Sequence, residues 1–479
     1  MPLETIPLVL LFFLRMPSHS TLRPSYTLFS LIALIVISMA VAFVPMEHPA
    51  ATPGSLNGAD VAWMLTATAF VLIMTPGLSF FYGGMVRPKN VISTMLQSFV
   101  AMGVITVLFY LVGFSLAYGD SWHGLIGNPL TFMALRNVGT APNPAFAATI
   151  PFVLFFAFQL KFAVITPALI TGSFAERVRF KGYLAFMVLF SLFIYCPLAH
   201  WTWHPEGFLR QWGVLDFAGG TVVHISAGIA ALAGAIVMGR RSAHVRQTSF
   251  STPNVPYVML GTGLLWFGWF GFNAGSSLAA NDIAALSFVN TTLASGAALI
   301  AWLLIETVWG GKPTAMGACI GAVVGLVAIT PAAGYVQYGH SIFIGVVSSL
   351  ISYAAVHWKN NRTTIDDTLD VFPCHGLGGI VGMLLTGVFA DKVGLIHGSA
   401  TTFGYHVLAL LIVVTYSFVG SWLLLKLTAN IFGLRVKAAD EELGLDLSQH
   451  EESTYHVDEE FERTYRKASG QTEEELIAQ

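Results

Sequence analysis

Apolar segments long enough to cross a lipid bilayer recur along almost the whole chain, and they constrain its fold more than any other feature. A hydrocarbon core of roughly 30 Å is crossed by about 20 helical residues. Eleven such runs, separated by short polar breaks, occupy residues 60–84, 92–118, 149–173, 182–201, 218–239, 256–275, 285–309, 315–333, 338–357, 371–390 and 402–425. The sequence therefore predicts an all-α polytopic membrane protein with eleven transmembrane helices.

Charged residues are rare and unevenly distributed. They make up 10% of the chain, whereas an average soluble domain has about 25%. Residues 433–479 hold 13 of the 26 acidic residues and 5 of the 23 basic ones. We therefore predict three parts: an N-terminal segment (1–59), a membrane domain (60–432) and an acidic tail (433–479). Nothing in them resembles a nucleic-acid-binding stripe, a phosphate-binding loop or an added catalytic domain.

The N-terminal segment has the layout of a secretory signal. An apolar stretch from Thr27 to Phe43 follows Arg23 and ends in Ala40-Val41-Ala42, which is the order of a positive region, an apolar region and a small-residue cleavage site. A cleaved signal peptide is the favoured interpretation, and a retained anchor helix is the alternative. A second apolar run within residues 1–22 fits neither, and Met16 is a possible start.

Basic residues in alternate loops predict the orientation, because cytoplasmic loops near span ends are enriched in lysine and arginine. Fourteen lie in one set of loops: Arg87, Lys89, Arg177, Arg179, Lys181, Arg240, Arg241, Arg246, Lys312, Lys359, Arg362, Lys426, Arg435 and Lys437. Three lie in the other set: Arg136, Arg210 and Lys392. With eleven spans, this places the N-terminus outside and the acidic tail in the cytoplasm.

Small residues and prolines modify the predicted spans. Gly317, Gly321 and Gly325 recur at four-residue spacing, which lets helices approach closely in lipid. Kinked or interrupted helices are expected at four prolines inside or beside spans, namely Pro76, Pro167, Pro331 and Pro373.

Two histidines occupy matching positions in the two halves of the membrane domain. His224 lies eight residues after Asp216 in the fifth span, and His375 lies five residues after Asp370 in the tenth. Five spans per half is an odd number, so a repeat between the halves must be inverted, and such repeats place transport sites near the midplane. Ionisable groups there normally face a partner or a polar path. We expect the two imidazoles to face each other and to act as a polar lining or a proton relay.

A metal-dependent membrane enzyme is an alternative interpretation of the histidines. Its ligands would come from His200, His204, His224, His375 and Asp216, but no HExxH or comparable pattern is present. The three cysteines, Cys196, Cys319 and Cys374, lie in apolar runs without paired spacing, so neither a disulfide nor a zinc site is predicted.

Six motifs, in order along the chain, resemble those of the Amt branch of the Amt/Mep/Rh ammonium transporter superfamily. They are Phe81-Tyr-Gly-Gly-Met-Val-Arg-Pro-Lys-Asn90, Phe158-Gln-Leu-Lys-Phe162, Ala175-Glu-Arg-Val-Arg-Phe180, the stretch from Asp216 to His224, Trp266-Phe-Gly-Trp-Phe-Gly-Phe272-Asn-Ala-Gly-Ser276, and Phe372-Pro-Cys-His-Gly. The resemblance extends from about Asp60 to His456. It implies a homotrimer in the plasma membrane with one path for ammonium or ammonia through each subunit, no cofactor and no metal.

The resemblance also implies roles for particular residues. His224 and His375 would be the twin pore histidines, Phe162 and Phe272 the stacked gate above them, and Trp269 a further neighbour of the pore.

At the outer side, Phe158, Trp203 and Ser276 would form the ammonium recruitment site. Asp216 would be an acid that organises that site without touching the substrate. Ammonium and potassium are nearly equal in size, so the Ser276 hydroxyl would select the ion that donates hydrogen bonds. Lys161 departs from the family pattern, and we expect its side chain to point away from the path.

The tail stretches Gly433-Leu-Arg-Val436 and Gly444 to His456 resemble the family's cytoplasmic tail, which implies contact with PII regulatory proteins. Methylammonium is the implied substrate analogue. An ammonium sensor that signals through this tail is the alternative to a transporter.

Overall fold

The structure, a computed structural model, describes residues 25–43, 47–246 and 254–454. Contacts divide the chain into two units, Met1–Met46 and Glu47–Gln479. In the first unit the structure describes one helix, α2 (Ser25–Phe43), which is apolar and exposed along most of the part whose side chains are described. The predicted signal peptide lies mostly within this unit, and residues 1–24 and 44–46 of it are outside the described residues.

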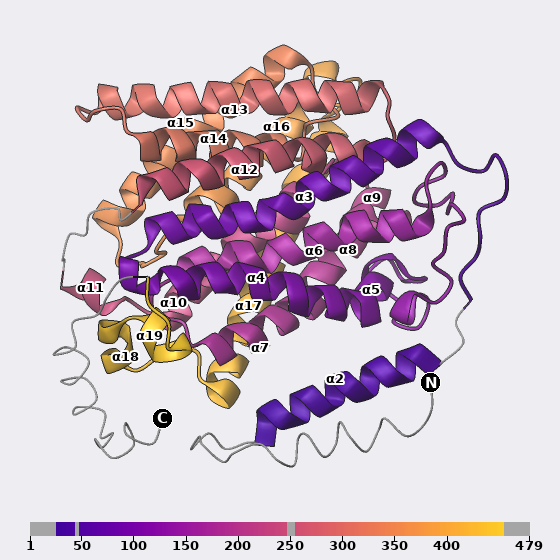
Figure 1. Ribbon diagram of the computed structural model, residues 1–479. Coiled ribbons are helices and arrows are strands. Elements are labelled where there is room, and N and C mark those ends of the chain that lie inside the picture. The colour runs from indigo at the N-terminus through magenta and orange to yellow at the C-terminus, as the bar shows by residue number, and fades with distance from the viewer. Residues whose placement is uncertain (1–24, 44–46, 247–253, 455–479) are drawn as a thin grey trace. The chain divides into compact units, whose positions relative to one another are not determined.

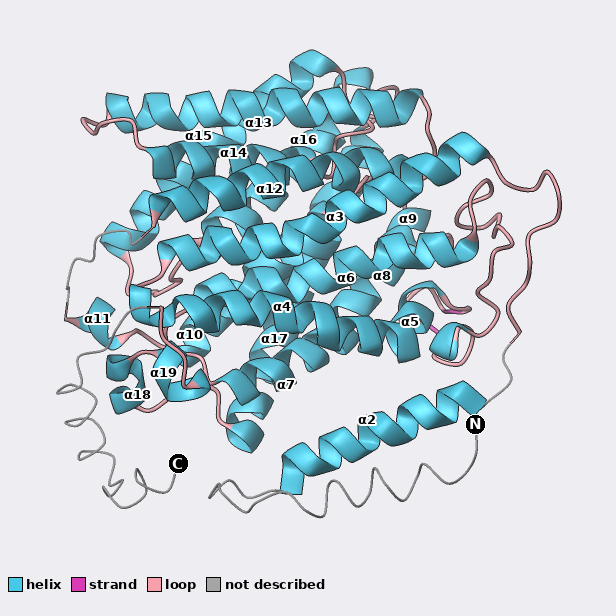
Figure 2. Cartoon of the chain, in the orientation of Figure 1, coloured by secondary structure: helices cyan, strands magenta, loops and turns pink. Residues whose placement is uncertain are grey.

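The second unit is a bundle of long helices that run side by side along a common direction (Figure 1). They are α3 (Gly58–Met85), α4 (Val91–Leu108) with α5 (Phe114–Tyr118), α6 (Phe152–Phe174), α7 (Phe180–Phe190) with α8 (Cys196–Trp203), α10 (Ser226–Met238), α12 (Val255–Ala274), α13 (Asp282–Val308), α14 (Ala315–Ile329), α15 (Tyr338–Arg362), α16 (Gly378–Phe389) and α17 (Ala400–Phe432). Loops and short elements collect at the two ends of this bundle (Figure 2).

The short elements are α9 (Phe208–Gln211), α11 (Ser242–Val245), α18 (Ala438–Leu443), α19 (Leu445–His450), and the 3-10 turns Pro88–Asn90, Met133–Leu135, Gly275–Ser277 and Leu395–His397. One antiparallel strand pair, β1 (Ser121–Trp122) with β2 (Ile126–Gly127), lies in the loop between α5 and α6.

The predicted membrane architecture is confirmed. Within the described residues, ten helices of the second unit are long and apolar enough to cross a bilayer, and they correspond to ten of the eleven predicted spans. The eighth span is α14, which has 15 residues and ends at Ile329, four residues before the predicted end. Thr330 still has helical backbone angles, but Pro331 has no N–H with which to donate the next helical hydrogen bond, so the helix ends here.

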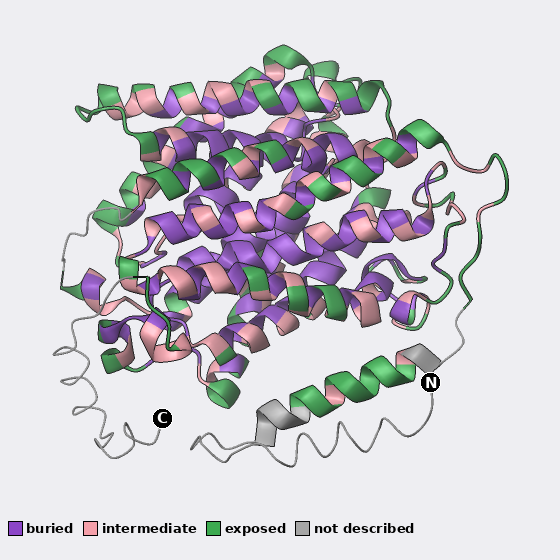
Figure 3. Ribbon diagram, viewed as in Figure 1, coloured by how far each residue is buried: buried purple, intermediate pink, exposed green. Residues whose placement is uncertain are grey.

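Two helices form the centre of the bundle. Most residues of α6 and of α10 are buried, whereas most of α17 is not, and Figure 3 shows the buried residues gathered in the middle of the unit. Apolar residues that remain exposed, such as Leu411 on α17 and Leu65 on α3, lie on the outside of the bundle. An apolar exterior is expected of a helical bundle whose surroundings are lipid.

The two halves share a local backbone device before each histidine. Gly219 has φ +116° and Asp370 has φ +56°, and each lies five residues before its histidine. A π-helical turn follows in both places, η6 (Gly220–Ile225) before α10 and η8 (Phe372–Leu377) before α16. Such turns are rare and are frequent at functional sites.

Candidate functional site

The two histidines meet at the centre of the bundle. Nδ1 of His224 lies 3.4 Å from Nδ1 of His375, and the rings are nearly parallel with centroids 5.5 Å apart. Both side chains are buried, and Nε2 of His224 has no hydrogen-bond partner among the described residues. Since one ring donates and the other accepts in a shared bond, the outer nitrogen is left to serve another molecule.

Close backbone contact brings the histidines together. A Cβ atom on Gly228 would lie 2.1 Å from the backbone nitrogen of Gly376. α10 and η8 therefore touch backbone to backbone, one residue beyond His375 and one helical turn beyond His224. This is the close approach in lipid that small residues permit.

Aromatic rings pack on one side of the histidines. The Phe162 and Phe272 centroids are 4.2 Å apart with the planes inclined by 32°, and Phe272 lies 5.9 Å from His224. Trp269 stacks on His224 at 5.3 Å. Its indole N–H donates to the Thr330 hydroxyl at 2.9 Å, which fixes the ring that supports His224.

The space beside the histidines is narrow. Two small cavities of about 10 Å³ each adjoin the pair, one toward Phe272 and one toward Tyr82 and Cys374. A cavity of about this volume is the smallest that can hold one water molecule. Apart from the histidines, the residues lining the cavity toward Phe272 are all apolar.

Beyond the Phe162–Phe272 pair lies a larger vestibule of about 300 Å³. Trp203 and Ser276 line it together with Phe162. The Ser276 hydroxyl donates to the Phe272 carbonyl at 2.8 Å. Its oxygen therefore remains an acceptor at the vestibule wall, where it can receive an N–H from a solute.

Asp216 holds the vestibule loop through hydrogen bonds to the backbone. Its carboxylate accepts from the N–H groups of Gly219 (2.8 Å), Gly220 (2.6 Å) and Thr221 (2.7 Å), and from the Thr221 hydroxyl. The Trp203 indole N–H donates to the Asp216 carbonyl at 3.2 Å. Asp216 is 5% exposed, and its carboxylate accepts hydrogen bonds from all four of these donors. It therefore caps the start of η6.

His406 on α17 supports the same loop. Its Nε2 accepts from the Leu215 N–H and its Nδ1 lies 3.0 Å from the Met383 carbonyl. Because a carbonyl only accepts, the ring must carry its proton on Nδ1. The sequence analysis missed this residue, since one histidine in an apolar helix gives no sign of its partner.

Phe158, which was predicted to belong to the recruitment site, and Lys161, which was expected to point away from the path, both lie away from the vestibule wall. Phe158 is fully buried, packs 4.9 Å from Phe162, and does not line the cavity. A Cβ on Gly275 would lie 2.9 Å from its ring. Lys161 is half-buried and lines neither the vestibule nor the cavities beside the histidines.

Several vestibule residues were not predicted as such. Gln159 lines the cavity and accepts the Tyr118 hydroxyl at 2.7 Å. A glutamine inside an apolar span was the available signal for it. Arg210 also lines the vestibule and donates to the Trp203 carbonyl at 2.6 Å, although the sequence analysis counted it only as a loop charge.

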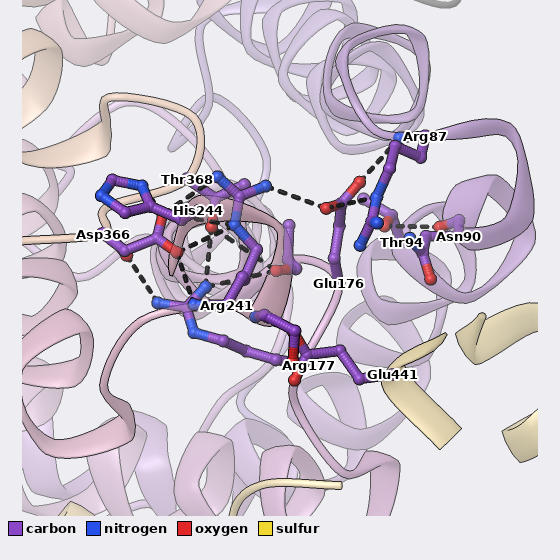
Figure 4. Close-up of polar contacts among 12 residues, drawn as sticks. Arg87, Asn90, Thr94, Glu176, Arg177, Arg241, His244, Asp366, Thr368 and Glu441 are labelled. Atoms are coloured by element: carbon purple, nitrogen blue, oxygen red, sulfur yellow. Dashed lines mark hydrogen bonds and ion pairs between the residues drawn. The ribbon is translucent and has the colours of Figure 1, made fainter. Parts of the chain in front are cut away.

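At the opposite end of α6, ion pairs join the ends of several spans (Figure 4). Glu176 receives Arg87 and Arg241 at 2.9 Å each, and Arg241 also pairs with Asp366 at 2.9 Å. Burial alone would raise the pKa of Glu176, but the charges and hydrogen bonds of Arg241 and Arg87 outweigh it and hold that pKa below its usual value.

The described part of the tail packs onto this network. Glu441 accepts from the Ser242 N–H and pairs with Arg435. Asp446 accepts from the N–H groups of Ile92 (3.0 Å) and Ser93 (2.7 Å) at the first turn of α4. A tail residue thus caps a membrane helix more than 350 positions away in the sequence.

The chain is similar to known proteins in sequence and in fold. The model of the Ammonium Transporter Family matches residues 62–455. An ammonium transporter of Aquifex aeolicus is 45% identical over 414 residues, which cover 85% of this chain and 96% of that protein. The crystal structure of Saccharomyces cerevisiae Mep2 superimposes with a TM-score of 0.77 at 34% identity, covering 85% of this chain and 93% of that one. A structure described as a sensor Amt protein gives a TM-score of 0.76 at 30% identity, covering 82% and 98%.

Proposed function

The chain belongs to the ammonium transporter family, and from this premise we propose that it moves ammonium or ammonia from the vestibule, past Phe162 and Phe272, to the paired histidines. The observation that carries the proposal is the meeting of His224 and His375 at the end of an otherwise apolar passage.

The vestibule has the chemistry to recruit a cation that donates hydrogen bonds. The Trp203 ring lies at its wall, and an aromatic face attracts a cation by about 0.5 to 2 kcal/mol. That attraction does not separate ammonium from potassium. The free lone pairs of Ser276 do, because only ammonium brings an N–H to them.

The passage beyond the vestibule favours the neutral species. A solute that enters between Phe162 and Phe272 leaves water behind and meets no carboxylate in the lining, and a bare charge in such surroundings is strongly disfavoured. Ammonium that releases its proton to water in the vestibule becomes ammonia, which can cross. His224 then offers Nε2 to the solute or to the proton.

Assembly and location follow from the same premise. We place the protein in the plasma membrane as a homotrimer, with the N-terminus outside and the tail in the cytoplasm. The docked tail lies beside the basic ends of the spans, and we propose that a PII protein contacts the surface of this tail. The asymmetry of basic residues supports this orientation.

Substitution of Ser276 tests the recruitment step against a neighbouring control. Ser277 donates to the carbonyls of Ala274 and Ala279 and does not line the vestibule. We expect Ser276→Ala to raise the half-saturating ammonium concentration about tenfold in proteoliposomes, the value of one hydrogen bond to a charged group. Ser277→Ala should leave it unchanged, and equal effects of the two variants would contradict the proposal.

An ammonium sensor remains the second candidate, favoured by the tail that caps α4 and by the similarity to the sensor Amt structure. Truncation after Phe432 distinguishes the two functions. A transporter should retain ammonium flux without residues 433–479, whereas a sensor should lose its signal to the cell.

A further inference from the structure

A second sizeable cavity, of about 220 Å³, opens where α13 ends and α14 begins, against α15. Its lining includes Trp302, Glu306, Tyr353 and His357. It shares no residue with the vestibule or with the small cavity toward Phe272, and one residue, Ile320, with the small cavity toward Tyr82 and Cys374. The transport path proposed above does not use it.

Glu306 brings a negative charge to this cavity. Its carboxylate accepts from the backbone N–H and the hydroxyl of Thr314, at 3.0 Å each. A Cβ on Gly317 would lie 2.2 Å from Oε1, so glycine is needed for the carboxylate to lie there. Among the residues that the structure describes, Glu306 forms no ion pair, and two of its roughly four acceptor positions remain open.

Aromatic rings form the wall beside the carboxylate. Tyr353 lies 5.2 Å from Trp302 and 5.4 Å from Trp309, and Trp309 stacks on His357 at 4.9 Å. The Asn361 side-chain amide donates to Nδ1 of His357 at 3.0 Å. Aromatic faces together with one carboxylate are suited to an ammonium group.

The surroundings of the cavity fit the rest of a lipid molecule. Leu304 and Val308, on the last turns of α13, are 61% and 76% exposed. Lys312 is an exposed cation in the adjoining loop. The region therefore offers an anion beside aromatic rings, a cation nearby, and an apolar surface along the helix.

We propose that this cavity is a binding site for the headgroup of phosphatidylethanolamine, with the ammonium group against Glu306 and the aromatic wall. The phosphate then lies toward Lys312, and the acyl chains lie along Leu304 and Val308. A primary ammonium donates N–H groups to a carboxylate, which the trimethylammonium of phosphatidylcholine cannot do. The exposed apolar surface favours a membrane lipid over a small water-soluble amine.

The test is lipid binding by the purified full-length protein, measured by native mass spectrometry. Phosphatidylethanolamine, phosphatidylcholine, phosphatidylglycerol and water-soluble phosphoethanolamine are titrated separately. Phosphatidylethanolamine should bind at least tenfold more tightly than phosphatidylglycerol. Equal affinities would overturn the proposal, and tight binding of phosphoethanolamine would show that the ligand is a soluble amine.

Variants locate the site. Glu306→Gln should weaken binding of phosphatidylethanolamine on the order of tenfold, because one charge-assisted hydrogen bond is lost. Asp282→Asn, at the exposed first turn of the same helix, is the matched control and should bind like the wild type. If Glu306→Gln does not fold, Tyr353→Leu removes the ring face and should weaken binding several-fold. Unchanged affinity in the folded Glu306→Gln or Tyr353→Leu protein would overturn the assignment.

Discussion

Replacing Asp216 with asparagine should destabilise the vestibule loop through a single backbone group. The asparagine oxygen can still accept from Gly219 and Gly220, and the Thr221 hydroxyl can turn to accept from the new amide. The Thr221 N–H, however, then faces an NH₂ group and loses its acceptor. A buried donor without a partner costs about 1 to 3 kcal/mol, and Asp216→Ala, which leaves three such donors, should cost more.

Thermal unfolding in detergent and ammonium flux in proteoliposomes measure the two consequences. Asp120→Asn is the control, because Asp120 is exposed and its carboxylate accepts one hydroxyl, that of Thr131. We expect the midpoint temperature of unfolding to be highest in Asp120→Asn, lower in Asp216→Asn and lowest in Asp216→Ala. Ammonium flux should decrease in the same order. If Asp216→Asn unfolded like the wild type yet lost flux, the carboxylate would act on the substrate directly, and the structural role would be refuted.

Three further predictions follow from packing and charge. Gly228→Ala should cost about 1 to 3 kcal/mol of unfolding free energy and reduce flux, because its Cβ would meet the backbone of Gly376; chemical denaturation measures the first effect. Thr330→Val should cost a similar amount by leaving the Trp269 N–H without an acceptor, and a Thr330→Ser variant should restore stability. Burial raises the pKa of Asp446 from an ordinary 3.8 to about 6. The stability that Asp446 contributes to the docked tail is therefore fully present below about pH 4 and is lost as the pH rises through 6. After correction for intrinsic rates, amide hydrogen exchange in the tail of the wild type should therefore be slower at pH 5 than at pH 7. The Asp446→Asn variant should not show this difference.

The sequence predicted the architecture because membrane spans are determined by length and apolarity alone. All eleven spans are present as helices. The one clear difference, the shorter α14, arises because Pro331 has no N–H to continue the helical hydrogen bonds. Apolarity continues past Ile329, but helical hydrogen bonding does not.

Without the family resemblance, the candidate site was predictable only where rare residues stood at matching positions. His224 and His375 were paired on that ground, and the structure brings them to 3.4 Å. Nothing in the sequence showed that Gly228 makes this distance possible, or that His406 supports the vestibule loop, since both depend on contacts between distant segments.

The tail illustrates the same limit. Its acidic composition gave no sign of burial, but Glu441 and Asp446 are buried against span ends. Apart from Arg435, which pairs with Glu441, their partners, such as the N–H of Ser93, are backbone groups. A backbone donor looks the same in every sequence, so composition could not reveal the docking.

The paired histidines are the central claim, and ammonium-evoked current together with internal pH, recorded on proteoliposomes, tests it most directly. The wild type should respond to ammonium and not to potassium, whereas His224→Ala and His375→Ala should lose at least tenfold in rate or lose this selectivity. That factor equals about 1.4 kcal/mol in the barrier. His340→Ala is the control, because His340 stacks on Phe389 away from the path. Wild-type rate and selectivity in both pore variants would contradict the account.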